Sequence, residues 1–330
     1  MIFHGSIYHH EIPAFLKPYL DTEAMQRLKH VDMNCGMNYT SYPRFREIEA
    51  YSRFHHSLGC ALIVWHFTHD RIQSLAALFH DIATPVFSHV VDFVYGDYEN
   101  QETTEERTAF LIMSDPGIMA QLDQDGIAVE LISDYHKYPV ADNASPRLCA
   151  DRLEYILGDL ADFKMADDQT IRSLYDNIEL MINEDGLKEP GFRDQSIACK
   201  FAYYALECGK IYSGDENRFA MEQLAGILRT ALKENIITQD DLYGCETDVI
   251  AKLKRSALNS RFAEFESCTR VIRTDASDPQ AICVSAKKRY IDPLCADGRR
   301  ISEHCADLQK SIREFVSLDY RYYVKGVTYE

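Results

Sequence analysis

The sequence predicts a mainly α-helical protein that ends in a small α+β appendage. From about residue 14 to residue 260 the apolar residues recur mostly at intervals of three and four, the spacing of amphipathic helices. Turn signals such as SDPG, DQDG and NEDG separate these stretches at helix-length intervals. Strand-like alternation occurs in three short stretches, at residues 36–43, 269–274 and 281–286. We therefore expect a helical body over residues 1–260 and the appendage over residues 261–330.

The clearest helical stretches, in chain order, lie at residues 56–70, 71–81, 146–160 and 219–236. Each repeats apolar residues along one face. Pro146 opens the third stretch, and proline suits the first turn of a helix because that turn needs no backbone N–H donor. Pro85 disfavours helical geometry at Thr84, so the second helix should end close to His80.

Composition limits the classes of partner. A chain of 330 residues can form one elaborated helical domain or two domains. Its 35 Lys and Arg against 52 Asp and Glu give a formal net charge of -17, which argues against nucleic-acid binding. The ten cysteines form no C-x-x-C pair, which argues against a zinc ribbon or a disulfide framework. The chain shows neither a long apolar run nor a secretion-signal pattern, so we expect a cytoplasmic protein without a membrane span.

Histidines cluster in the first third of the chain. Six of the twelve lie at positions 55, 56, 66, 69, 80 and 89. His80 and Asp81 stand out because the apolar LAALF before them predicts a buried helix, where an isolated carboxylate is unfavourable unless it is paired or bound to a metal. The alternative is a helix-terminal His80 that interacts with the helix dipole, beside an Asp81 that caps the next segment.

Two further stretches extend this pair. RFHHSLG, residues 53–59, opens the preceding helix, and ADRLEYILGD, residues 150–159, places Asp151 at the start of a later one. Two imidazoles and two carboxylates make a mixed nitrogen and oxygen site. Such a site suits a divalent metal ion: manganese, iron, zinc, cobalt, nickel or magnesium.

These motifs resemble the HD superfamily, specifically its deoxynucleoside triphosphate (dNTP) triphosphohydrolase branch, which contains bacterial dGTPases and the mammalian sterile-alpha-motif/HD-domain enzyme. The resemblance rests on LDTEAMQRLKHVDMNCGMNYTSYP, SRFHHSLG, ALFHDIATPVFSH and DRLEYILGD, in this order, between about residues 20 and 160. It continues more weakly to about residue 260 through ALKENIITQDDLYG. It implies an HD-domain helical fold with its motif core at residues 50–165.

The resemblance also implies roles for individual residues. The implied metal ligands are His56, His80, Asp81 and Asp151. The implied catalytic residues are His89 with Asp92 for proton transfer, and Arg53, which with Arg152 faces phosphates. Tyr155 and Asp159 are implied at a sugar, and Tyr212 remains at a position expected near the substrate.

The spacing of these residues agrees with such roles. His89 and Asp92 are three apart, so in a helix the carboxylate can orient the imidazole and keep it protonated for a leaving oxygen. Arg53 lies one turn before His56, where a guanidinium can make a bidentate phosphate contact. The alternatives are a hydrogen-bonded core histidine at position 89 and ordinary ion pairs at Arg53 and Arg152.

The chain departs from the family pattern at two outer histidines. Thr84 stands where the family has a third histidine, and Thr104 stands at the histidine of a later motif, here TEERT at residues 104–108. Threonine is neutral and cannot carry a proton near neutral pH, so stabilisation of a polyphosphate transition state should suffer. The stretch YYALECGKIY, residues 203–212, also lacks the His and basic residues expected to meet phosphates.

We therefore expect a metal-dependent phosphohydrolase that acts on a nucleotide-like phosphate ester, with the dNTP triphosphohydrolase reaction as the leading hypothesis. The alternatives are a nucleotidase-type phosphomonoesterase and a non-catalytic regulatory homologue that binds metal or nucleotide. The resemblance also implies a homo-oligomer. The acidic run at residues 96–106 is expected to be a solvated loop, with a lid over the site as the alternative.

Overall fold

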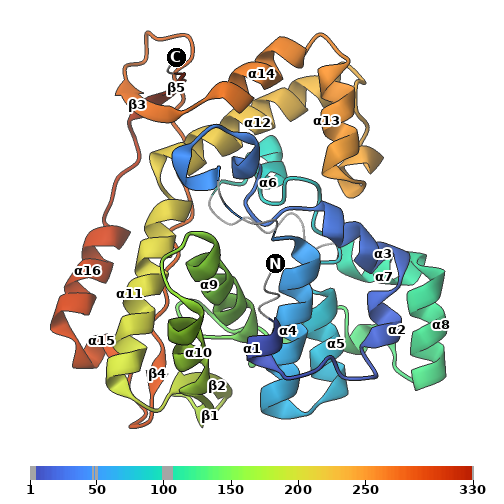
Figure 1. Cartoon of the computed structure of the whole chain (residues 1–330), viewed down its shortest axis with the longest axis vertical. Helices are drawn as coiled ribbons and strands as arrows, with labels where there is room; N and C mark the ends of the chain where they lie inside the picture. The colour runs from blue at the N-terminus through green and yellow to red at the C-terminus, as the bar shows by residue number, and fades with distance from the viewer. Residues whose placement is uncertain (1–4, 47, 49–50, 99–106, 329–330) are drawn as a thin grey trace.

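The computed structural model describes residues 5–46, 48, 51–98 and 107–328, and they are mainly helical (Figure 1). The α-helices of the first half are α1 (Gly5–Tyr8), α2 (Lys17–Leu20), α3 (Glu23–Arg27), α4 (Arg53–Thr68), α5 (Arg71–Phe79), α6 (Val90–Tyr95), α7 (Thr108–Ser114), α8 (Pro116–Asp125) and α9 (Ala150–Asp162). Those of the second half are α10 (Asp168–Asp176), α11 (Gln195–Tyr212), α12 (Asp215–Lys233), α13 (Glu246–Lys254), α14 (Asn259–Ser267), α15 (Ile301–His304) and α16 (Ala306–Val316).

Short 3-10 helices and strands complete the fold. The 3-10 helices are η1 (Leu28–His30), η2 (Met37–Tyr39), η3 (Pro43–Phe45), η5 (Val129–Leu131), η6 (Tyr135–Lys137) and η7 (Asp240–Tyr243). The strands are β1 (Ile178–Ile182), β2 (Lys188–Phe192), β3 (Arg270–Thr274), β4 (Leu294–Cys295) and β5 (Tyr323–Val327). The mainly helical class predicted from the sequence is confirmed. Among the described helices, none combines the length and the apolar character that a membrane crossing requires.

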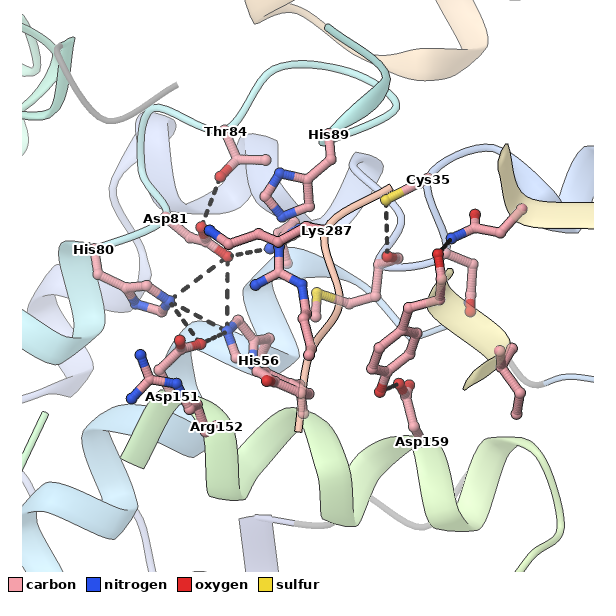
Figure 2. Close-up of a pocket in the computed structure, with 18 of the residues that line it drawn as sticks. Cys35, His56, His80, Asp81, Thr84, His89, Asp151, Arg152, Asp159 and Lys287 are labelled. Carbon is pink, nitrogen blue, oxygen red and sulfur yellow. Dashed lines mark hydrogen bonds and ion pairs between the residues drawn. The ribbon is translucent and has the colours of Figure 1, made fainter. Parts of the chain in front are cut away.

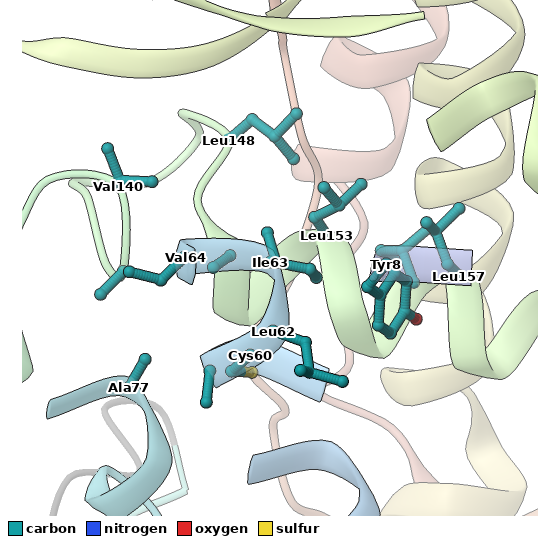
Figure 3. Packing of buried hydrophobic residues seen from close by; sticks show 14 of the residues in the cluster. Tyr8, Cys60, Leu62, Ile63, Val64, Ala77, Val140, Leu148, Leu153 and Leu157 are labelled. Atoms are coloured by element: carbon teal, nitrogen blue, oxygen red, sulfur yellow. The ribbon is translucent and has the colours of Figure 1, made fainter. Parts of the chain in front are cut away.

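The larger of two hydrophobic cores surrounds α4, which packs against both α5 and α9. Leu62 and Ile63 of α4 meet Leu153 and Leu157 of α9 there (Figure 3). Full burial of a leucine or isoleucine side chain contributes roughly 1.5–3 kcal/mol, so this contact holds the two helices firmly together. At the start of α5, the carboxylate of Asp70 accepts hydrogen bonds from the first-turn N–H groups.

A second core lies at the other end of the molecule, around α6, α12, α13 and α14 (Figure 1). It buries Val90 and Phe93 of α6 against Leu224 and Leu228 of α12. Residues 36–43, predicted as a strand, form η2 and the start of η3 instead, so that prediction is wrong. Local hydrogen bonds favour the turn: both the amide and the hydroxyl of Thr40 donate to the carbonyl of Met37. The alternating aromatic residues there serve core packing, not a sheet.

The strands form two small sheets. β1 and β2 pair antiparallel, with Ile178 opposite Phe192, and β4 joins β2 in parallel. This hairpin surrounds the predicted NEDG turn, in which Gly186 has a φ of 77°. β3 pairs antiparallel with β5, which confirms the strand predicted at residues 269–274. The stretch 281–286 makes one isolated bridge, from Ile282 to Val324.

The tail, residues 261–330, runs back along the helical body (Figure 1). Its α15 and α16 pack on α11, and β3 and β5 pack on α12. The division of the chain at residue 260 stays a prediction, although contacts of the tail cross it at both cores. One boundary inside the body differs from expectation: α9 begins at Ala150 with Cys149 as its N-cap, so Pro146 is not in its first turn.

We predict that Gly209 is required for the path of the tail. A Cβ atom at Gly209 would lie 2.0 Å from the carbonyl oxygen of Arg289, whereas one at Gly226 would meet only the flexible end of Arg261. Gly209→Ala should therefore lower the free energy of unfolding by about 1–3 kcal/mol, the usual result of overpacking. Gly226→Ala should be neutral, or stabilising by up to about 1 kcal/mol, because alanine favours the helix. Equal stability of the two variants in chemical denaturation would contradict this reading.

Candidate metal centre

Three helices bring the four predicted metal ligands together (Figure 2). His56 lies in the first turn of α4, His80 and Asp81 directly follow α5, and Asp151 is the second residue of α9. The Nε2 atom of His56 lies 3.1 Å from Oδ1 of Asp151 and 3.8 Å from Oδ2 of Asp81. The Nε2 atom of His80 lies 3.7 Å from that Asp81 oxygen and 3.9 Å from the Asp151 oxygen. Asp81 and Asp151 therefore each place one oxygen beside both Nε2 atoms.

The imidazole rings of His56 and His80 turn their Nε2 atoms toward each other. Nδ1 of His80 lies 2.7 Å from the carbonyl oxygen of Ala77, which can only accept, so that nitrogen carries the proton. Nδ1 of His56 lies 2.6 Å from Oε2 of Glu154 and donates to this carboxylate. Each Nε2 can then turn a lone pair toward a cation, and the two lie 3.2 Å apart. Burial lowers the pKa of His56, but Cys60 and the hydrogen bonds with Asp151 and Glu154 raise it well above its ordinary value, so without an ion Nε2 of His56 can carry a proton toward Asp151. Because a divalent cation can replace that proton, the donor set fits a metal ion.

Asp81 is held as an anion. Burial alone would raise the pKa of its carboxyl group, but Arg53 and the two imidazoles hold that pKa well below its usual range. Nη1 of Arg53 donates to Oδ2 over 2.8 Å, and the hydroxyl of Thr84 donates to Oδ1 over 2.8 Å. Thr84, which stands where the resemblance expects a third histidine, thus orients a candidate ligand.

Arg27 of α3 holds the loop that carries Asp81. Its guanidinium Nη2 donates to the carbonyl oxygens of Ile82, at 2.9 Å, and Thr84, at 2.8 Å. Burial lowers the pKa of Arg27 to about 10, and the group stays charged at neutral pH. The sequence analysis missed this role, because the contact joins residues 55 and 57 positions apart.

Cys60 also lies near His56, His80 and Asp151. Its sulfur is 3.8 Å from both ring nitrogens of His56, so it faces the side of the ring and not the Nε2 lone pair. Burial raises the pKa of the Cys60 thiol to about 12. Asp81, with one oxygen turned toward both Nε2 atoms, fits better as the fourth ligand.

Glu154 supports His56 from behind the candidate ligands. Its fully buried carboxylate accepts hydrogen bonds from His56 and from the hydroxyl of Tyr51. A Cβ atom at Gly59 would lie 2.4 Å from Oε1 of Glu154, and one at Gly158 would lie 2.8 Å from the Tyr51 hydroxyl oxygen. Both glycines therefore make room for this hydrogen-bonded chain. Sequence reasoning missed Glu154, although its place three residues after Asp151 on one helix face was an available signal.

His89 and Asp92 form the expected hydrogen bond, with 2.9 Å between Nδ1 and Oδ2. Asp92 is fully buried, whereas 29% of the His89 side chain is exposed to the cavity. Burial lowers the pKa of His89, and Arg53 and Arg289 lower it further, against the opposing effect of Asp92. These effects oppose the expectation that Asp92 keeps His89 protonated. In the neutral imidazole Nδ1 donates to Asp92, and Nε2 is then the acceptor.

The two predicted phosphate-binding arginines line the cavity but already have protein partners. Arg53 is bound to Asp81 and, through Nε, to the hydroxyl of Ser88 at 2.9 Å. Nη1 of Arg152 donates to the carbonyl oxygen of Asn143 at 2.6 Å, and Nη2 lies 3.4 Å from Oδ1 of Asp142. These contacts place the guanidinium groups rigidly. Phosphate binding by Arg53 and Arg152 stays a prediction.

Tyr155, Asp159 and Tyr212 form a second group in the cavity wall. The rings of Tyr155 and Tyr212 meet edge to face with centroids 6.1 Å apart. The Tyr212 hydroxyl donates to Asp159. Burial raises the pKa of Asp159 to about 7, although this hydrogen bond opposes the shift. α9 and the end of α11 thus present hydroxyl and carboxyl groups, which can bind a hydroxylated group such as a sugar.

One cavity of about 540 Å³ joins these groups. Every predicted site residue lines it except Asp92, which lies behind His89. It also takes in Lys287 and Arg289 of the tail, which the sequence analysis assigned to an appendage and did not connect with the site. No short-range signal could have found them. Thr104 and residues 99–106 of the acidic run lie outside the described residues, so the lid prediction stays open.

Comparison with known proteins gives two sequence relatives, and no family model matches the chain. YdhJ, an uncharacterized protein of Bacillus subtilis (strain 168), is 26% identical over 322 residues, which cover 96% of this chain and 95% of YdhJ. The metal-dependent phosphohydrolase cns2 of Cordyceps militaris is 31% identical over 114 residues. That match covers 34% of this chain and 32% of cns2, so the fungal protein is similar over about a third of its length.

A solved structure is similar over nearly the whole chain. The crystal structure of a phosphohydrolase from Bacteroides thetaiotaomicron aligns with a TM-score of 0.63 and 16% identity, covering 97% of each chain. At this identity the likeness shows the shared fold. The cluster of His, Cys and Asp donors and the name of cns2 together support a divalent metal ion in the cavity.

We predict that Asp81 holds the metal and Cys60 does not. Asp81→Asn removes the negative charge turned toward both Nε2 atoms, so purified protein reloaded with manganese should contain far less metal than the wild type. Cys60→Ala should retain the wild-type metal content. Metal analysis by mass spectrometry after removal of free ion measures both, and loss of metal in Cys60→Ala alone would assign the site to the thiol.

We also predict that Glu154 sets metal affinity through His56. Glu154→Gln weakens the hydrogen bond that fixes the tautomer and orientation of the imidazole, a change that typically lowers metal affinity about 10–100-fold. Glu179→Gln, on an exposed position of β1, is the matched control and should not change it. Competition with a chelating dye measures the dissociation constants. An unchanged affinity in Glu154→Gln would show that His56 does not depend on this support.

Proposed function

We propose that this protein is a metal-dependent phosphohydrolase of the HD type that acts on a nucleotide-like phosphate ester. The observation that carries the proposal is the pair of Nε2 atoms, 3.2 Å apart, with two carboxylates beside them in a cavity that arginine side chains also line. The names of the fungal relative and of the structural neighbour support the same reaction class.

A divalent ion bound by His56, His80, Asp81 and Asp151 would supply Lewis-acid polarisation of a phosphoryl oxygen and would acidify a water molecule. The remaining steps belong to the chain's own groups. Arg53 and Arg152 face the charge that develops on phosphate oxygens. Neutral His89 accepts a proton from the attacking water at Nε2 and returns it to the leaving sugar oxygen, while Asp92 holds its Nδ1–H and stabilises the imidazolium between these steps. Glu154 keeps His56 in the ligand tautomer.

The substrate we propose first is a dNTP. In that reaction water adds to the α-phosphorus, the bond from this phosphorus to the sugar 5′ oxygen breaks, and nucleoside and tripolyphosphate leave. Tyr155, Asp159 and Tyr212 would meet the sugar. A cavity of about 540 Å³ lies within the range of small-molecule sites, and it has room for such a substrate.

A nucleotidase-type phosphomonoesterase is the second candidate. Thr84 favours this candidate, because its hydroxyl donates a hydrogen bond to Asp81 and not to a polyphosphate chain. A regulatory homologue that binds metal or nucleotide without turnover remains the non-catalytic alternative. Assembly into a homo-oligomer stays a prediction that the single chain does not address.

We predict hydrolysis that depends on the metal and on Asp81. Manganese-loaded protein is incubated with a panel of dNTPs, NTPs and nucleoside monophosphates, and the products are separated by anion exchange. Tripolyphosphate is expected from the wild type and at least about 100-fold less from Asp81→Ala, because that variant loses a ligand. Orthophosphate only from monophosphates would replace the leading substrate by the second one. Turnover that survives in Asp81→Ala would contradict the assigned metal centre.

A further inference from the structure

We propose that Lys287 and Arg289 of the tail bind the phosphate groups of the substrate, so that the tail completes the catalytic cavity. The proposal deepens the proposed function and rests on it in one respect, namely that the substrate carries phosphate. It would add cationic groups to a cavity to which residues 203–212 of α11 contribute none, because Lys210 there is exposed, pairs with Glu207 and does not line the cavity.

The backbone path turns these two side chains toward the cavity. Residues 285–290 contain no helix or strand, and the chain there passes the metal-ligand cluster as an extended segment (Figure 2). In an extended chain successive side chains point to opposite sides. Lys287 and Arg289 line the cavity, whereas Lys288 between them donates from Nζ to the carbonyl oxygens of Val316 and Leu318, each at 2.5 Å. Lys288 thus lies on the far side of the segment.

Contacts at both ends and in the middle hold the segment in place. The carbonyl oxygen of Val284 accepts a hydrogen bond from the fully buried Arg218. Ile291, just after the segment, is buried in the larger core. Between them, Gly209 of α11 admits the Arg289 carbonyl at a distance that no side chain would allow. Lys287 and Arg289 therefore lie on a segment that is held in place at both ends and in the middle.

The positive charge of Arg289 affects the pKa of two groups that would contact the substrate. It lowers the pKa of His89, together with burial and Arg53. It also opposes the burial that raises the pKa of Tyr155. His89 and Tyr155 belong to opposite parts of the site, the first before α6 and the second on α9. The Arg289 guanidinium therefore acts on both the proton-transfer residue and the sugar-facing wall.

The charge balance of the cavity depends on the tail. Its lining includes four carboxylates: Asp81, Asp142, Asp151 and Asp159. Within the described part of the helical body, two lining cations of the Lys or Arg type, Arg53 and Arg152, stand against these four groups. Lys287 and Arg289 bring the lining cations to four, so a bound divalent ion then gives the cavity net positive charge. Without the tail, the same ion would leave the two cations and four carboxylates at zero net charge, in a chain of net charge -17.

The test uses the full-length, manganese-loaded protein and inorganic tripolyphosphate as the probe, measured by isothermal titration calorimetry. Lys287→Gln and Arg289→Gln should each weaken binding about tenfold or more, because each removes a charge-assisted hydrogen bond. The matched control, Lys288→Gln, removes the same charge one residue away and should bind as the wild type does. Unchanged binding in both cavity variants, equal weakening in the control, or no binding by the wild type would each overturn the proposal.

A second measurement on the wild type does not depend on the folding of a variant. Acetylation by acetic anhydride is followed at Lys287 and Lys288 by tandem mass spectrometry, with and without tripolyphosphate. The probe should protect Lys287 and leave the modification rate of Lys288 unchanged, and equal rates at Lys287 in both conditions would contradict the proposal. Failure here is distinct from failure of the proposed function, since the product panel would still show metal-dependent hydrolysis.

Discussion

The facing Nε2 atoms of His56 and His80 are the constraint around which the other groups of the site are arranged. Each imidazole has its Nδ1 proton committed to an acceptor on the protein, His56 to Glu154 and His80 to the carbonyl of Ala77. The two Nε2 atoms lie 3.2 Å apart, a separation that is favourable when a cation is present, either a proton on His56 or a metal ion that both rings bind. The fold maintains it because α4, α5 and α9 share one well-packed core.

Hydrogen bonds from neighbouring side chains hold the candidate metal ligands in position. Arg53 and Thr84 fix the two oxygens of Asp81, Arg27 fixes the loop that carries it, and Glu154 fixes His56. These contacts explain how Thr84 occupies a family histidine position without loss of order at the metal centre. The hydroxyl holds a ligand by a neutral hydrogen bond, and the positive charge that a histidine could bring near a phosphate is absent there. In our account the tail supplies positive charge from the other side of the cavity.

The sequence allowed the helical class and the grouping of His56, His80, Asp81 and Asp151 to be predicted, because a buried His-Asp pair at a helix end needs a partner and the neighbouring motifs supply one. It did not allow the strand at residues 36–43 to be excluded, since aromatic alternation there arises from core packing. Arg27, Lys287 and Arg289 act through contacts between segments far apart in the chain, and local patterns carry no sign of such contacts. The spacing of His89 and Asp92 indicates their hydrogen bond, but it does not reveal the burial and the two arginines that lower the pKa of His89 against the effect of Asp92.

The most direct test of this account is the anomalous difference map of a crystal of the manganese-loaded protein. The account predicts one strong peak in the cavity, about 2.0–2.3 Å from Nε2 of both histidines and from oxygens of Asp81 and Asp151, distances typical of first-row metals with these donors. Lys287 and Arg289 should face that peak across the cavity. A peak bound to Cys60, a peak at Asp142 and Cys149, or no peak in metal-loaded crystals would contradict the central claim that the facing imidazoles hold the catalytic ion.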